Sequence, residues 1–291
     1  MPARGFAKPR RTIRLRRAVA IIALLGLAVA SWVLFRGTTE REPVARHGAR
    51  ITELTVASDA VGEQLPVNVV RPPGEKARGR GLLVFLHGRS ANEGSFLDSE
   101  LFTALKRLGA RAPVVAFPYG GDHSYWHDRE DGDWGRYVTG EVIPQVARRF
   151  DIDPRRVAIG GISMGGFGAF DIARLHPGRF CAVGGHSPAL WATSGETAPG
   201  AFDDADDFAR HNVIGAARVR PSPYGRQPIW VDAGTRDPFD SGVTAFAEAL
   251  SSSGVPATVR RWPGGHDHGY WTSHWGDYLR FYAKALRSCP A

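Results

Sequence analysis

A glycine-flanked serine is the first feature of the chain that could do chemistry. Gly161, Ser163 and Gly165 fit the pattern Gly-x-Ser-x-Gly, in which a sharp turn between a strand and a helix presents the serine oxygen. The pattern is short enough to occur by chance, so its context has to decide. Residues 156–160 are predicted to form a strand and residues 164–175 a helix. We therefore predict that Ser163 is a nucleophile.

A nucleophilic serine needs a base within hydrogen-bonding distance and an acid that orients the base. In α/β-hydrolases the acid and then the histidine follow the serine, on loops after later strands. Asp237 follows the predicted strand 229–233 and is the predicted acid. His266 follows the predicted strand 257–262 and is the predicted base, with His268 as the alternative.

The negative oxygen of an acyl-transfer intermediate is stabilised by backbone N–H groups. One predicted donor is the amide of Met164, directly after the nucleophile. The other is the amide of Arg89, at the turn that follows the predicted strand 81–86. His87 is expected to support this turn rather than act as a second base. The alternative is a plain turn at His87 and Gly88 with no catalytic role.

The histidines after the last predicted strand could instead bind zinc, because alternate histidines on an extended segment can face one ion. His266 and His268, with Asp267 and the nearby His274, form this candidate set. A third ligand at convincing spacing is missing, so we predict no metal and no organic cofactor.

Strand and helix patterns alternate along the chain from residue 51 onward. The predicted strands cover residues 51–57, 66–70, 81–86, 113–117, 156–160, 180–184, 229–233 and 257–262, and the predicted helices cover residues 97–108, 137–150, 167–175, 239–252 and 271–287. Such alternation is typical of a mostly parallel sheet with helices on both faces. The predicted fold class is therefore α/β, as one doubly wound α/β-hydrolase domain over residues 51–291.

Two long segments, 119–134 and 186–227, interrupt the alternation and are rich in Gly, Pro, Asp and aromatic residues. Long loops after the strands of an α/β sheet often border the ligand site. His123 and His127 are expected to be solvated or to face a substrate. Some aromatic residues are expected to form the wall of an acyl or alcohol site, with ordinary packing as the alternative: Tyr119, Tyr125, Trp126, Trp134 and Trp191.

Charge and hydropathy set the N-terminal part apart from the rest. Residues 1–17 hold seven of the 37 Lys and Arg and no acid, so most of the +8 charge lies there and no nucleic-acid groove is predicted. Residues 18–35 are uncharged and long enough to span a bilayer, and the basic flank places the following domain on the outer side. A cleaved signal peptide or a buried core helix is the alternative. Residues 36–50 are predicted to be a linker.

Cys181 and Cys289 are the two cysteines of the chain. An exported chain could join them, but two thiols far apart in sequence do not make a disulfide framework. No bridge is predicted, and the question of pairing stays open.

Several short motifs resemble an esterase family of the α/β-hydrolase fold: FLHG at 85–88, WGRYVTGEVIP at 134–144, AIGGISMGGFGA at 158–169, GHSPALW at 185–191 and PGGHD at 263–267 with Trp271. That family includes S-formylglutathione hydrolases, feruloyl and siderophore esterases, and mycolyltransferases. The resemblance covers roughly residues 51–286. Its motifs are specific for the fold and the triad, and much less specific for the substrate.

The resemblance bears on the choice of base. In feruloyl-type and siderophore-type members the base is the histidine of the Gly-Gly-His motif, which corresponds to His266. In S-formylglutathione hydrolases it belongs to an Asp-His pair, which corresponds to His268. The spacing to Trp271 favours His266. Segment 186–227 matches the variable cap of the family, so the resemblance implies no substrate residue there.

These observations predict an exported or membrane-anchored serine esterase that forms an acyl-Ser163 intermediate on a small-molecule, lipid or sugar ester. An acyltransferase of the mycolyltransferase type would share every catalytic residue. A non-catalytic envelope-binding domain that kept the fold is the alternative from another class. The oligomeric state is not predicted.

Overall fold

The computed structural model describes residues 44–74 and 79–289. Residues 45–291 form one compact unit. The basic flank 1–17, the apolar segment 18–35 and most of the predicted linker lie outside the described residues. Within the described part, no helix is both long enough and apolar enough to cross a bilayer.

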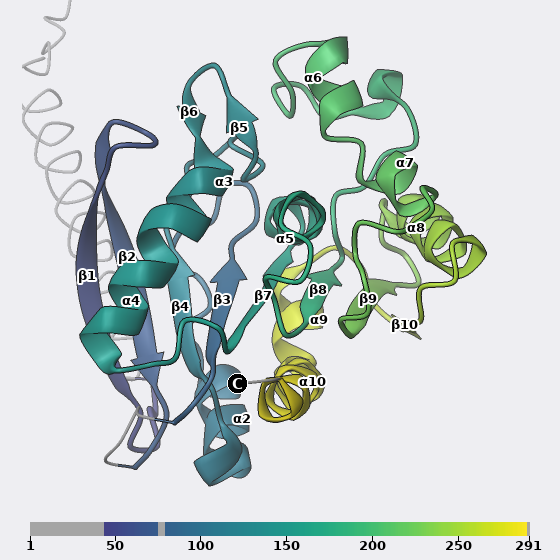
Figure 1. Cartoon of the computed structure of the whole chain (residues 1–291). Helices are drawn as coiled ribbons and strands as arrows, with labels where there is room; N and C mark the ends of the chain where they lie inside the picture. The colour runs from purple at the N-terminus through teal and green to yellow at the C-terminus, as the bar shows by residue number, and fades with distance from the viewer. Residues whose placement is uncertain (1–43, 75–78, 290–291) are drawn as a thin grey trace, which may run out of the picture. The chain divides into compact units, whose positions relative to one another are not determined.

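In the described part, eight strands form one sheet in the order β1-β2-β4-β3-β7-β8-β9-β10 (Figure 1). β1 pairs antiparallel with β2, which pairs antiparallel with β4, and the other neighbours are parallel. The mostly parallel sheet is therefore confirmed. The strands are β1 (Arg50–Ser58), β2 (Glu63–Arg71), β3 (Leu82–Leu86), β4 (Val114–Pro118), β7 (Val157–Ile162), β8 (Val183–His186), β9 (Ile229–Gly234) and β10 (Ala257–Trp262).

Helices cover both faces of the sheet (Figure 1). The main helices are α2 (Ser99–Leu108), α3 (Trp134–Arg136), α4 (Ile143–Phe150), α5 (Met164–Leu175), α8 (Asp240–Ser252) and α10 (Trp275–Ser288). One hydrophobic cluster joins one face of the sheet to α4, α5 and α8, and a second joins the other face to α2 and α10. Central strands such as β3 are apolar throughout because they are buried on both faces.

Two predicted helices are interrupted. The predicted helix 137–150 contains a π-helical stretch, Tyr137–Val142, before α4 begins. The predicted helix 271–287 is divided into α9 (His268–Ser273) and α10. The break lies at His274, whose ring Nδ1 lies 2.6 Å from the Tyr270 carbonyl oxygen while its amide bonds to Trp271. In a continuous helix the amide of His274 would donate to the Tyr270 carbonyl. Here the His274 side chain contacts that carbonyl instead.

The two long segments contain short elements that the sequence did not predict. Segment 119–134 holds a small antiparallel pair, β5 (Asp128–Arg129) and β6 (Gly132–Asp133). Segment 186–227 holds α6 (Ala205–Arg210) and α7 (Val213–Ala217), drawn in green at the upper right of Figure 1. Short 3₁₀ turns lie at Gly109–Arg111 and Ser194–Glu196.

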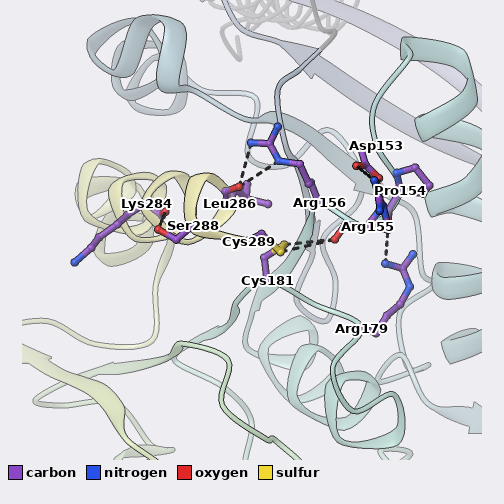
Figure 2. The surroundings of a disulfide bond; sticks show 10 residues. All are labelled: Asp153, Pro154, Arg155, Arg156, Arg179, Cys181, Lys284, Leu286, Ser288 and Cys289. Carbon is purple, nitrogen blue, oxygen red and sulfur yellow. Dashed lines mark hydrogen bonds and ion pairs between the residues drawn. A yellow bond between two sulfur atoms is a disulfide. The ribbon is translucent and has the colours of Figure 1, made fainter. Parts of the chain in front are cut away.

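Cys181 and Cys289 form a disulfide, with their Cα atoms 5.4 Å apart (Figure 2). The expectation of no bridge was wrong, because α10 returns along the sheet and brings the end of the chain to the segment before β8. The guanidinium of Arg156 also donates hydrogen bonds to the Leu286 carbonyl, at 3.3 and 3.1 Å. The last turn of α10 is therefore held both covalently and by hydrogen bonds.

Candidate active site

Ser163 lies at the sharp turn between β7 and α5, with φ of 55°. This left-handed conformation is uncommon for a residue with a side chain. The flanking glycines are required by crowding. A Cβ atom on Gly165 would overlap the carbonyl oxygen of Leu86, and one on Gly161 would lie 2.7 Å from the same oxygen. The structure therefore has the tight strand-to-helix turn that the pattern predicts.

The structure brings Ser163, His266 and Asp237 together in one row of hydrogen bonds. The Oγ atom of Ser163 lies 2.9 Å from Nε2 of His266. The Nδ1 atom of His266 lies 3.0 Å from Oδ2 and 3.2 Å from Oδ1 of Asp237. The acid follows β9 and the histidine follows β10. The three loops meet because parallel strands place their carboxyl ends at one edge of the sheet.

The surroundings of Asp237 favour its charged form. Burial raises the pKa of this carboxyl, but the hydrogen bond and charge of His266 and the Phe239 amide lower it more, so the pKa lies below its ordinary value. The Phe239 amide donates to Oδ1 at 2.8 Å. An ionised Asp237 holds the proton of the neutral imidazole on Nδ1, which leaves Nε2 free to accept from Ser163.

The alternative base, His268, lies elsewhere. Its ring stacks on Phe96 with centres 5.5 Å apart, and its Nε2 lies 3.9 Å from Oδ2 of Asp98. Its side chain is 58% exposed, whereas that of His266 is 21% exposed. His266 is thus the histidine that the structure places at Ser163.

The candidate zinc ligands face different neighbours. Asp267 caps α9 by accepting from the Tyr270 amide, and His274 stacks on Trp262. Among residues 44–74 and 79–289, no group of three or more metal-binding side chains could hold an ion.

His87 supports the turn beside Ser163. Its Nδ1 lies 2.9 Å from the Gly88 carbonyl oxygen, and its Nε2 accepts from the Gly120 amide at 2.9 Å. Burial lowers the pKa of His87 to about 4, so the ring is neutral at neutral pH. Its carbonyl accepts from the indole of Trp126 at 3.1 Å. These contacts fit the structural role expected of His87.

The two predicted oxyanion donors lie on the turns around Ser163. Met164 is the first residue of α5, and the first amides of a helix have no acceptor within the helix. Arg89 follows Gly88, where an added Cβ atom would lie 3.2 Å from the Cβ of Ser163. The turn that carries Arg89 therefore lies against the serine. Their catalytic role stays a prediction.

A family model described as "Putative esterase" matches residues 58–281. The chain belongs to this esterase family. Its relatives include Esterase Rv1288 of Mycobacterium tuberculosis, 24% identical over 253 residues, which cover 72% of this chain and 54% of the relative. They also include S-formylglutathione hydrolase of Paracoccus denitrificans, 26% identical over 215 residues, which cover 71% of this chain and 72% of the relative. The chain spans about half the length of the first of these relatives.

The solved structure of an S-formylglutathione hydrolase from Agrobacterium tumefaciens matches with a TM-score of 0.71 and 19% identity. The match covers 84% of this chain and 98% of that one. At this identity the likeness shows the fold alone, which is of the α/β-hydrolase type. The predicted membership of the esterase family and its fold are both confirmed.

In this member of the esterase family, two tryptophans expected on the site wall lie in the core, as does Tyr125. Trp126 is 0% exposed and Trp134 is 6% exposed. A Cβ atom on Gly168 would overlap Trp126, so that indole is packed directly against α5. Burial of these large apolar rings under the loop is the more favourable outcome. Neither indole presents a face to a substrate here.

The other three candidates lie closer to the surface or to an aromatic cluster. Tyr119 is half-buried and contacts His87. Tyr125 is buried, and half-buried Trp191 contacts it with ring centres 5.6 Å apart. The cluster that they join is completed by Phe167, Phe202 and Phe239.

In the described part of the chain, the rings of Phe239 and Trp271 contact His266. Each meets His266 edge to face with centres 5.0 Å apart. Phe239 was not predicted to be a site residue, although it closely follows the predicted acid Asp237. Trp191 lies behind Phe239, with centres 5.6 Å apart. An apolar aromatic surface therefore extends from the base toward segment 186–227.

A buried polar cluster joins segment 186–227 to segment 119–134 and to α5. Nε2 of His127 lies 3.1 Å from Oδ2 of Asp207 on α6. Nδ1 of His211 lies 2.8 Å from Oδ2 of Asp171 on α5, and the two imidazoles are 4.5 Å apart. The expectation that His127 is solvated or faces a substrate was wrong, because it is 1% exposed and paired with an acid. Sequence alone gave no partner for it.

Acid is expected to weaken this cluster. Burial raises the pKa of Asp207, but His127, the Asp203 amide and the charge of His211 lower it more, to about 2. Because the pKa of Asp207 is lower in the folded chain than in the unfolded chain, its charged form stabilises the fold at any pH above the unfolded pKa. This stability is lost as the pH falls from about 4 to about 2. Asp207→Asn should remove about 1 to 2 kcal/mol of unfolding free energy at pH 7.

Thermal unfolding of both proteins from pH 7 to pH 2 checks this prediction. The gap between wild type and Asp207→Asn should shrink as pH falls below about 4. Glu248→Gln, on the exposed side of α8, is the matched control and should leave the profile of the wild type unchanged. A gap that stays constant down to pH 2 would contradict the role given to Asp207.

Proposed function

We propose that the chain is a serine esterase that cleaves carboxylic esters through an acyl-Ser163 intermediate. The row of hydrogen bonds from Asp237 through His266 to Ser163 carries this proposal. His266 takes the serine proton as Oγ attacks the ester carbonyl, and gives it to the departing alcohol. Water then attacks the acyl group with His266 as base, which releases the acid and restores Ser163. Asp237 stabilises the imidazolium in both steps.

The amides of Met164 and Arg89 are proposed to stabilise the negative oxygen of both tetrahedral intermediates. Met164 begins α5, so the partial positive charge of the helix N-terminus adds to its donor. The turn of Arg89 lies against Ser163 through Gly88. Backbone donors on rigid turns need no rearrangement as the charge develops.

Rings near the base support an ester whose acyl or alcohol part is apolar or aromatic. Phe239 and Trp271 contact His266, and Trp191 extends this surface. Aromatic faces bind aryl, lipid or sugar groups by burial of apolar area. Several relatives carry the name S-formylglutathione hydrolase, so a thioester is a second substrate to include in a screen.

We also propose that the domain acts outside the cytoplasm. The uncharged segment 18–35 after a basic flank supports export. The disulfide between Cys181 and Cys289 is an independent observation in favour, because disulfides persist in oxidising compartments. Mass spectrometry of the protein recovered from cells would distinguish the two routes: an intact N-terminus supports an anchor, and a shortened one supports a cleaved signal.

Trapping the acyl-enzyme tests the proposed mechanism. The purified protein should release p-nitrophenol from a p-nitrophenyl ester with a burst of one equivalent, and acid quenching should leave one acyl group on the peptide that contains Ser163. Repeating the reaction with trehalose separates hydrolysis from transfer. An acyl-trehalose product in place of the free acid would favour the acyltransferase, and turnover with no acyl group on Ser163 would contradict both.

A further inference from the structure

A carboxylate outside the proposed triad lies buried behind it. Asp232 belongs to β9 and is 0% exposed. Its Oδ2 atom accepts hydrogen bonds from Nδ1 of His186 and Nε1 of Trp230, both at 2.7 Å. Its Oδ1 atom accepts from the hydroxyls of Tyr270 at 2.9 Å and Tyr278 at 3.1 Å. Such a group is tolerated in a core only when it is well supplied with donors.

The tyrosines of this network remain protonated donors. Burial and the charge of Asp232 raise the pKa of Tyr270, Tyr278 and Tyr282. The hydroxyl of Tyr282 lies 3.0 Å from Nε2 of His186. Nδ1 of His186 lies against Asp232 and Nε2 against Tyr282, so both ring nitrogens have a polar partner.

Two loops of the triad are joined to this network through the backbone. The Ser163 amide donates to the His186 carbonyl at 3.0 Å. The Ser187 amide donates to the Asp232 carbonyl at 2.8 Å. Asp232 and Asp237 lie on the same strand and the turn that follows it. The backbone at the nucleophile and at the acid is thus close to residues of the network, but neither Ser163 nor Asp237 is bonded to the Asp232 carboxylate itself.

The third loop, which carries the base, is tied to it by Tyr270. The amide of Tyr270 donates to Asp267 at 2.9 Å, directly after His266. Its ring packs on Gly264, where an added Cβ atom would lie 2.5 Å from Tyr270 Cδ2. Its hydroxyl reaches Asp232. One side chain therefore spans from the loop of the base to the core.

We propose that Tyr270 is a positioning residue for His266, in that its hydroxyl on Asp232 fixes the loop 263–267 so that the imidazole lies between Ser163 and Asp237. This inference rests on the proposed function. Catalysis is sensitive to shifts of about 1 Å in a reacting group, which can cost roughly 10²-fold in rate. Removing the Tyr270 hydroxyl leaves the ring against Gly264 but breaks the hydrogen bond that fixes Tyr270 to Asp232.

Tyr278 provides a matched control within the same network. Its hydroxyl donates to the same oxygen of Asp232. It lies on α10, and its ring packs on His186 with centres 3.6 Å apart. Tyr270→Phe and Tyr278→Phe thus each remove one hydroxyl donor from Oδ1 of Asp232. Of the two residues, Tyr270 is the one that contacts the loop 263–267.

Steady-state kinetics and thermal unfolding of the full chain test the proposal. Both variants should lower the unfolding temperature by a similar amount, because each loses one hydrogen bond to a buried carboxylate. Tyr270→Phe should lower kcat by about 10- to 100-fold with little change in KM, and Tyr278→Phe by less than about 3-fold. Equal losses of kcat in the two variants would overturn the positioning role. A wild type without turnover would overturn the proposed function instead.

A proton NMR spectrum distinguishes a change in the position of His266 from a general loss of stability. The Nδ1 proton of His266, identified by its absence from His266→Ala, should be lost or broadened in Tyr270→Phe and kept in Tyr278→Phe. If Tyr270→Phe does not fold, Asp267→Ala removes the hydrogen bond between the loop and the Tyr270 amide and leaves the contact of the ring with Gly264. It should then lower kcat by about 3- to 10-fold, because the loop is loosened only in part. An unchanged kcat in a folded Asp267→Ala would overturn the proposal.

Discussion

Replacing His266 with alanine is expected to lower the rate of ester hydrolysis by about 10⁴-fold or more, because the members of a triad act as a unit. Nε2 of His266 lies 2.9 Å from Ser163 Oγ, and its other nitrogen is held by Asp237. Without the imidazole the serine keeps its proton, and nothing protonates the leaving alcohol. The rates would be measured with p-nitrophenyl esters at saturating and limiting concentrations.

His268→Ala is the control for this loss. This histidine is exposed and stacks on Phe96, away from the row of hydrogen bonds. Its replacement should change kcat by less than about 3-fold, because a substitution at this exposed position disturbs the stability of the fold only slightly. Loss of activity in His268→Ala with retention in His266→Ala would show that the alternative base is the true one.

The second large effect is expected on stability, from removal of the disulfide. Cys181 and Cys289 are 108 residues apart in sequence. A cross-link over a loop of about 100 residues stabilises a fold by about 4 to 5 kcal/mol in the chain-entropy model. The double variant Cys181→Ala, Cys289→Ala should therefore unfold at a midpoint far below that of the wild type, in denaturant as well as on heating.

The activity of the double variant should be retained at temperatures where it is folded. Cys181 precedes β8, whereas Ser163 follows β7, so the bridge and the serine lie at opposite ends of neighbouring parallel strands. Dithiothreitol provides the control, because it should lower the midpoint of the wild type and leave that of the variant unchanged. Equal midpoints in the oxidised wild type and the variant would contradict the stabilising role of the bridge.

The sequence was most informative where chemistry depends on local backbone and on strand order. The pattern around Ser163 predicted the tight turn, because only glycine fits at positions 161 and 165. The order of strands predicted that the loops of Asp237 and His266 meet at one edge of the sheet. These features need no knowledge of side-chain packing.

The sequence was least informative where packing between distant segments decides the outcome. His127 lies in a loop rich in glycine and acids and was expected to be solvated or to face a substrate, yet it is buried and paired with Asp207, which comes much later in the chain. The pairing of the cysteines depends on the path of α10, which no local pattern contains. Asp232 falls inside the predicted strand 229–233, and its four donors, His186, Trp230, Tyr270 and Tyr278, lie on separate parts of the chain.

Labelling with a fluorophosphonate tests whether Ser163 is the nucleophile. The reagent reacts with an activated serine and does not depend on the identity of the natural ester. The wild type should take up one equivalent, on the peptide that contains Ser163, and Ser163→Ala should take up none. Absence of labelling in the folded wild type, or the same labelling in Ser163→Ala, would contradict this role of Ser163.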